Sequence, residues 1–89
     1  LGIVLGGSGN GEQIAANKVK GIRAALAWSI ETAKLAKDHN NANVIAVGGR
    51  MHEISFVKEI IDAFIAHPFS DDERHVRRIK KISDFENKA

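Results

Sequence analysis

The chain has 89 residues, enough for one small domain and too few for two. Hydrophobic residues make up 44% of it and charged residues 27%, a balance typical of a folded globular chain rather than a disordered or fibrous one. The net charge of +2 gives no strong reason to expect a nucleic-acid partner. The absence of cysteine excludes a disulfide framework, a cysteine-ligated metal and a thiol nucleophile, and it fits a cytoplasmic location. No apolar run approaches the ~20 residues of a membrane span, so no membrane association is expected.

Residues 1–18 predict a strand, a glycine-rich turn and the start of a helix. The apolar run LGIVL at 1–5 indicates a buried strand, GGSGNG at 6–11 indicates a turn, and a helix is expected from about Gly11 to Lys18. Glycines let the backbone turn sharply and approach a ligand closely, and the free N–H groups at a helix start attract anions. The spacing matches neither a Walker A loop nor G-x-G-x-x-G, since Glu12 stands where the last glycine would be needed. The turn therefore predicts an oxyanion or phosphate cradle, and a tight connection without a ligand is the plainer alternative.

Strands and helices alternate along the rest of the chain. The sequence predicts a strand within 22–28, a helix from a Ser29 cap to Asp38 and a strand at 44–47. Two helices follow. The first contains Ile54 to Ile65 and stops before Pro68, and the second covers about 71–86 and is opened by a capping box at 70–73. This order indicates an α/β fold with a parallel sheet, with about three strands and four helices in a single domain over 1–89. In such sheets ligands gather where strands end, here at 6–11, 28–29 and 48–50. Because the sequence begins inside an apolar strand, we interpret the domain as partial, with one sheet edge lacking its neighbour.

Two polar side chains near the glycine-rich turn are candidates for chemistry. Glu12 follows the turn and could act as a general base on a proton next to a carbonyl group. An ordinary contact with the helix start is the alternative role for this carboxylate. Ser8 could hydrogen-bond a substrate oxygen or relay a proton, and stabilisation of the turn is its alternative role. The glycines around Ser8 do not have the register of a Gly-x-Ser-x-Gly nucleophile elbow.

The histidines predict one candidate for acid/base chemistry and no metal site. His39 lies near an expected helix end beside Asn40, where a histidine commonly caps the last carbonyl groups. Its functional alternative is acid/base chemistry on the oxygens of a sugar. His52, His67 and His75 show no metal-ligand spacing with one another or with carboxylates, so no bound metal is expected.

Three arginines are candidates for binding an anion. Arg50 follows a glycine pair at a strand end, where a guanidinium group can bind an anion. Arg74 and Arg78 are four residues apart and therefore share one face of the last helix. Two guanidinium groups on one face suit a phosphate monoester, and a solvated basic face is the alternative. A nucleic-acid surface is disfavoured because the chain has one Trp, no Tyr and a nearly neutral charge.

Three motifs of this sequence resemble one known family. The stretches GGSGNGEQIAANKVKGIRAAL, AKDHNNANVIAVGGR and DAFIAHPFSDDERHVRRIKKI are similar, in this order, to the ribose-5-phosphate isomerase type B family, also called the RpiB/LacAB sugar-phosphate isomerases. The similarity extends over nearly all of the chain. Family members are longer, and this chain resembles their C-terminal part. The resemblance implies a Rossmann-like three-layer α/β/α fold.

The resemblance also implies an activity and the residues that perform it. The activity is interconversion of ribose 5-phosphate and ribulose 5-phosphate, in the pentose phosphate pathway, without a metal or nucleotide cofactor. One branch of the family uses a cysteine at the position of Gly6, whereas the branch with GGSGNGE uses the glutamate, here Glu12. By matching position, Glu12 takes the proton from C2, Ser8 moves a proton between O1 and O2, and His39 with Asn40 opens the furanose ring. The other implied substrate contacts are made by the backbone around Gly7, Gly9, Asn10 and Gly11 and by the phosphate-binding Arg50, Arg74 and Arg78.

The resemblance implies that two copies share each active site. A homodimer, or a tetramer built from it, is expected, with His39 and Arg50 supplied by the partner subunit. An Asp-His pair from the family's first strand also belongs to the site and is not in this sequence, so the chain alone is expected to be inactive or weakly active. Two alternatives are an isomerase of another phosphosugar, such as a hexose 6-phosphate, and a non-catalytic module for phosphosugar binding or dimerisation.

Overall fold

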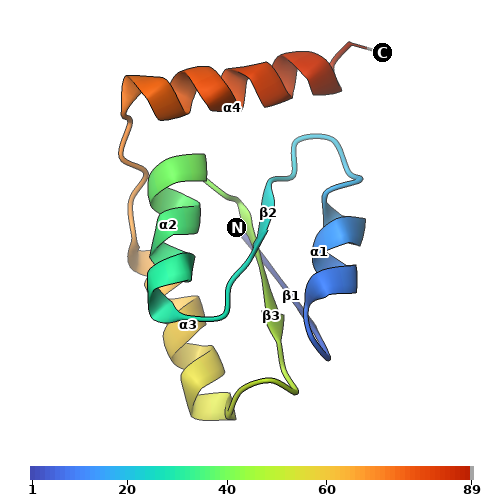
Figure 1. Ribbon diagram of the computed structural model, residues 1–89, viewed down its shortest axis with the longest axis vertical. Coiled ribbons are helices and arrows are strands. Elements are labelled where there is room, and N and C mark those ends of the chain that lie inside the picture. The colour runs from blue at the N-terminus through green and yellow to red at the C-terminus, as the bar shows by residue number, and fades with distance from the viewer. Residues whose placement is uncertain (89) are drawn as a thin grey trace.

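The computed structural model describes residues 1–88 and confirms the predicted fold class. Its elements, in chain order, are β1 (Gly2–Gly6), α1 (Asn10–Ala16), β2 (Ala24–Leu26), α2 (Ile30–Asn40), β3 (Val44–Gly48), α3 (Ile54–Ala66) and α4 (Glu73–Glu86). The strands form one parallel sheet in the order β1-β3-β2 (Figure 1). Three parallel strands and four helices are the α/β architecture that the sequence predicts.

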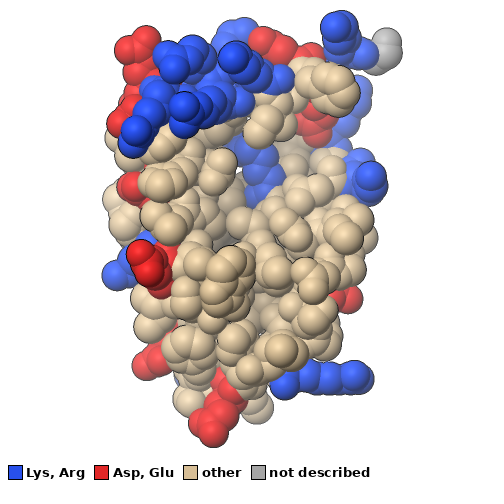
Figure 2. All heavy atoms as spheres, in the orientation of Figure 1, with Lys and Arg blue, Asp and Glu red and all other residues tan. Residues whose placement is uncertain are grey.

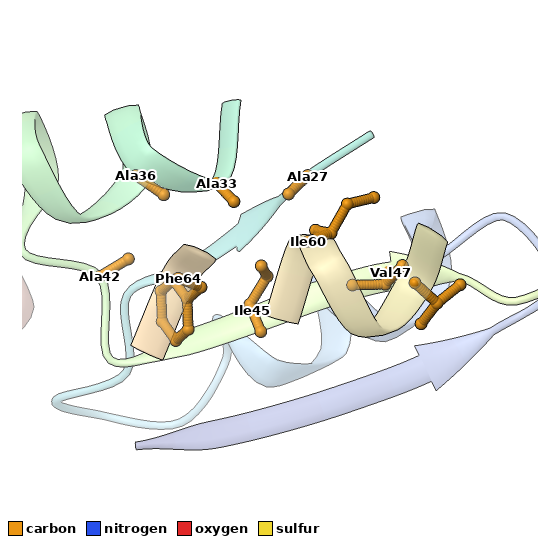
Figure 3. Close-up of a cluster of buried hydrophobic side chains, with 9 residues drawn as sticks. Ala27, Ala33, Ala36, Ala42, Ile45, Val47, Ile60 and Phe64 are labelled. Atoms are coloured by element: carbon orange, nitrogen blue, oxygen red, sulfur yellow. The ribbon is translucent and has the colours of Figure 1, made fainter. Parts of the chain in front are cut away.

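Helices cover both faces of this sheet. The helix α1 packs against all three strands on one face, while α2 and α3 lie on the other (Figure 1). Ile45 and Val47, on alternate positions of β3, point to the second face and are fully buried. They pack against Ala33 of α2 and against Ile60 and Phe64 of α3, as Figure 3 shows. The hydrophobic core therefore lies between β3 and the α2–α3 pair.

Several element boundaries differ from the prediction for local reasons. Ser29 caps α2 as expected, because its hydroxyl accepts a hydrogen bond from the N–H of Thr32 at 3.1 Å. The predicted capping box at 70–73 is wrong: the N-cap of α4 is Asp72, whose carboxylate accepts from the N–H of Arg74 at 3.0 Å. Consequently α4 begins at Glu73 rather than at about residue 71. Of the apolar run at 22–28, only 24–26 pair with β3, so β2 is shorter than expected.

The strand β1 is not buried as the sequence predicted. Leu1, Ile3 and Leu5 are 75%, 46% and 56% exposed. The register pairs Ile3 with Ile45 and Leu5 with Val47, so these side chains point to the same face as the core. However, α2 and α3 lie over β2 and β3 and leave this face of β1 uncovered (Figure 1).

The edge strand β2 is closed by a side chain rather than by another strand. The amide of Asn17 donates to the carbonyl oxygen of Ala24 at 2.9 Å and accepts from its N–H at 2.8 Å. This pair of bonds mimics a neighbouring strand at that residue, and Gln13 adds a bond to the same carbonyl at 3.3 Å. Within the described residues, no helix is long and apolar enough to cross a membrane.

Candidate active site

The glycine-rich loop lies at the carboxyl end of β1 and is fastened to the end of β3. The N–H of Gly49 donates to the carbonyl oxygen of Gly6 at 2.7 Å, and the N–H of Arg50 donates to that of Gly7 at 3.1 Å. Gly9 is the N-cap of α1 and has a φ of 87°, in the left-handed region that favours glycine. A Cβ at Gly9 would also lie 2.8 Å from Cδ1 of Leu26. The loop therefore requires glycine at position 9 for both conformation and space.

The carboxylate of Glu12 occupies the space above Gly6. Glu12 stands in the first turn of α1 and is half-buried. A Cβ built at Gly6 would overlap the carboxylate of Glu12. Because Gly6 has no side chain, the carboxylate can lie directly over the end of β1. A side chain at position 6 and this position of the Glu12 carboxylate are therefore mutually exclusive.

Ser8 and Asn10 interact with each other at the rim of this loop. The hydroxyl of Ser8 accepts hydrogen bonds from the backbone N–H and from the side-chain amide of Asn10, both at 3.3 Å. Both residues are exposed, and they also line a small pocket of about 250 Å³ with Trp28, Met51 and His52. The turn-stabilising role considered for Ser8 is thus visible, and its hydroxyl remains accessible to a ligand.

Arg50 lies beside the same loop. The Cδ and Nε atoms of its side chain are 3.5 Å and 3.7 Å from the position of a Cβ at Gly7. The side chain of Arg50 therefore lies next to Gly7 of its own chain, and its supply by a partner subunit stays a prediction. The structure therefore groups the loop at 6–11, Glu12 and Arg50 at the carboxyl ends of the strands; we call this set the cradle group.

The other predicted site residues lie at the opposite end of the molecule. Because α2 runs from the carboxyl end of β2 back to the amino end of β3, its last residues, His39 and Asn40, lie far from the cradle group (Figure 1). Arg23 holds this helix end, donating to the carbonyl oxygens of Asn40 at 3.1 Å and Asn41 at 2.9 Å.

The basic helix α4 crosses the same end. Arg74 and Arg78 are exposed there, and Figure 2 shows the Lys and Arg side chains gathered over α4. Together His39, Asn40, Arg74 and Arg78 form what we call the amino-end group. The chain brings each group together and keeps the two groups apart.

Four further residues, none of them predicted as a site residue, form a contact network with His39. Asp38 and His75 meet His39 directly, and His67 and Ser70 contact these two. His75 is buried, and its ring lies against that of His39 with centroids 4.4 Å apart. The local sequence does not reveal this set, because its members come from α2, α4 and the segment that joins α3 to α4. Among residues 1–88, no three His, Asp or Glu side chains are placed to hold a metal ion.

Comparison with known proteins identifies relatives over the whole described chain. Residues 1–82 match the Ribose/Galactose Isomerase family, LacAB_rpiB. A ribose-5-phosphate isomerase B of Mycobacterium leprae is 63% identical over 86 residues, which are 97% of this chain and 53% of that protein. The chain thus spans about half the length of the curated relatives it matches.

Solved structures agree with this match. A type B ribose 5-phosphate isomerase from Trypanosoma cruzi superposes with a TM-score of 0.97 at 47% identity, covering all of this chain and 59% of that one. The Mycoplasma genitalium ribose-5-phosphate isomerase B with bound ribulose-5-phosphate gives a TM-score of 0.95 at 45% identity, with coverage of 100% and 58%. With its parallel sheet, its glycine-rich loop and a family match over 1–82, this chain belongs to the ribose/galactose isomerase family.

Proposed function

We propose that this chain provides the base and the phosphate-binding groups of an isomerase that interconverts ribose 5-phosphate and ribulose 5-phosphate. The relatives named for this activity, at up to 63% identity, support the substrate class. The observation that carries the proposal is the Glu12 carboxylate over the side-chain-free Gly6, within the cradle group. We place the activity in the cytoplasm as part of the same proposal.

In this proposal the chemistry needs one base and a site for one oxyanion. The carboxylate of Glu12 removes the proton from C2 of the open-chain aldose, and the electrons of that C–H bond form the enediolate. Returning the proton to C1 gives the ketose, while Ser8 carries a proton between O2 and O1. Backbone N–H groups at Gly7, Gly9 and Gly11 stabilise the enediolate oxygen, a preorganised contribution that is often the largest in such reactions.

The separation of the two groups supports a shared site in a homodimer. His39 with Asn40 would open the furanose ring, and Arg74 with Arg78 would hold the phosphate. They lie at the end of the chain opposite Glu12, and the long dimension of the molecule is 39 Å. Each substrate would therefore meet the cradle group of one copy and the amino-end group of another, with Arg50 on the cradle side.

The base assignment is tested by paired substitutions at positions 12 and 6. The assay follows ribulose 5-phosphate formation by the chain itself and by a chimera in which the preceding half of the Mycobacterium leprae relative is joined to residue 1. We expect Glu12→Gln in the chimera to lower kcat by at least about 10²-fold, in the range of a lost general base, with phosphosugar affinity changed by only a few-fold. Gly6→Ala should lower kcat as well, because its Cβ displaces the Glu12 carboxylate. A Glu12→Gln chimera with near-normal kcat would contradict the proposal.

One alternative substrate follows from the family itself. The family description includes galactose as well as ribose, so a hexose 6-phosphate is the second candidate. Comparing kcat/KM for ribose 5-phosphate and galactose 6-phosphate in the same chimera decides between them. A chimera that binds both sugars and converts neither would instead favour a non-catalytic phosphosugar-binding module.

A further inference from the structure

The helix α4 buries one of its described residues, a histidine, and its far end accepts a hydrogen bond from the N–H of Gly21 through Glu86 at 2.7 Å. His75 is the buried residue of α4, with 7% of its surface exposed. Its ring faces that of His39 on α2, with centroids 4.4 Å apart and planes inclined by 37°. The side chain of His39 itself is 43% exposed, so one imidazole is accessible to a ligand and the other lies behind it.

A hydrogen bond joins the supporting ring to Ser70. The hydroxyl of Ser70 lies 3.2 Å from Nδ1 of His75 and also accepts from the N–H of Asp72 at 3.2 Å. The N–H of Ser70 donates to the carbonyl oxygen of Asp38 at 3.3 Å, which ties the α3–α4 connection to the end of α2. A phenylalanine at position 75 could stack on His39 but could not bond to Ser70.

A carboxylate lies beside the exposed ring. The two oxygens of Asp38 lie 3.5 Å from Nε2 of His39 and 3.4 Å from Nε2 of His67. The contact to His67 has the geometry of a hydrogen bond, whereas the contact to His39 is an approach of neighbouring side chains. The exposed imidazole therefore has a carboxylate and a second ring as close neighbours.

We propose that His75 is a positioning residue for His39: the ring of His75, which lies against that of His39, sets the orientation of the exposed imidazole. This inference rests on the proposed function for the role of His39 and adds the residue that sets its geometry. An imidazole that is already oriented loses less freedom on reaching the reacting geometry, and small displacements of a catalytic group cost up to about a hundredfold in rate. The adjoining ring of His75 limits the rotation of His39.

The structural half of this proposal is tested on the 89-residue chain by NMR of the imidazole groups. An aromatic ring stacked on His39 displaces the His39 Cε1–H and Cδ2–H signals through its ring current. We expect His75→Leu to move these signals to the positions of an unstacked imidazole and His75→Phe to keep most of the displacement. The matched control is His52→Leu, which should leave the His39 signals unchanged. His52 also meets an aromatic ring, that of Phe56 at 5.4 Å, but it lies near the cradle group. Circular dichroism melts identify any variant that is unfolded.

Unchanged His39 signals in a folded His75→Leu chain would overturn the proposal, since the two rings would then not meet in solution. A second readout separates positioning from simple stability. In the chimera, His75→Leu should lower kcat roughly ten- to a hundredfold with KM within about twofold, and His75→Phe should recover most of that loss. A change in KM alone, or no recovery with Phe, would also overturn it. A wild-type chimera without isomerase activity would overturn the proposed function instead, and the NMR comparison would still decide the contact between the rings.

Discussion

At the scale of single residues, the glycines at 6, 9 and 11 have three different structural surroundings. Gly6 leaves room for the Glu12 carboxylate, which is a flexible neighbour. Gly9 combines a φ of 87° with close contacts to Leu26 and to the backbone at the end of β3. A Cβ at Gly11 would meet no atom within 4 Å. The loop thus contains one glycine that leaves room for a carboxylate, one that its conformation requires, and one without a steric conflict.

These differences predict opposite stability changes for two neighbouring substitutions. Gly9→Ala should lower the free energy of unfolding by about 2–4 kcal/mol, because it adds left-handed strain to an overlap with rigid backbone. Gly11→Ala, inside a helix and without a steric conflict, should raise it by up to about 1 kcal/mol. Urea melts of the two variants and the wild-type chain measure both changes. Equal effects at the two positions would contradict the geometry of the loop.

The residue scale also shows what the sequence can and cannot predict about the site. Glu12 and Arg50 follow glycine-rich strand ends, so local pattern places them in the cradle group. The sequence presents His75 only as a histidine without metal-ligand spacing, because its burial depends on where α4 packs in the folded chain. The capping error at Ser70 has the same origin, since the Ser70 hydroxyl bonds to His75 and leaves the cap of α4 to Asp72.

At the scale of elements, the short strand β2 depends on an amide from α1. Only three residues of β2 pair with β3, and the outward-facing backbone of Ala24 is satisfied by Asn17. A backbone N–H and C=O without these partners would have to be hydrated at an exposed sheet edge. The amide therefore joins α1 to the sheet and closes the edge at the same time.

We expect Asn17→Ala to lower the free energy of unfolding by about 1–2 kcal/mol, because it removes two hydrogen bonds to one part-buried residue. Asn87→Ala is the matched control, since the side chain of Asn87 makes no hydrogen bond among the described residues. Parallel urea melts compare the two. An Asn17→Ala chain as stable as the control would show that the amide hydrogen bonds contribute little to the free energy of unfolding.

At the scale of the whole molecule, the arrangement of the two groups determines how a complete site can form. The sequence predicts the members of both groups and their chemistry. Their separation follows from the topology. In a parallel sheet, residues that precede a strand lie at the amino ends of the strands, and residues that follow a strand lie at the carboxyl ends. By the same rule Arg50, which follows β3 as the glycine-rich loop follows β1, lies at the cradle end of its own chain.

A shared site predicts that two inactive variants restore each other. In the chimera, Glu12→Gln and Arg78→Ala should each be inactive or weak, and their mixture should regain about a quarter of wild-type activity. Half of the randomly formed dimers are mixed, and each mixed dimer has one intact site of two. The control mixture pairs Glu12→Gln with Arg50→Ala; both residues belong to the cradle group, so no intact site forms. Restoration in the control and not in the test mixture would contradict the division of the site.

The shallow burial of α4 has a consequence for local unfolding. This helix buries one histidine and leaves Val76, Ile82 and Phe85 44%, 50% and 80% exposed, so we expect it to open as a cooperative unit of its own while the sheet stays intact. Its amide hydrogens would then exchange with solvent faster than those of β3, whose five residues are all buried. If Arg74 and Arg78 bind the phosphate, binding must also supply the free energy that keeps α4 closed. The substrate would thus act as a ligand that orders this helix, and slower amide exchange in α4 would report its binding.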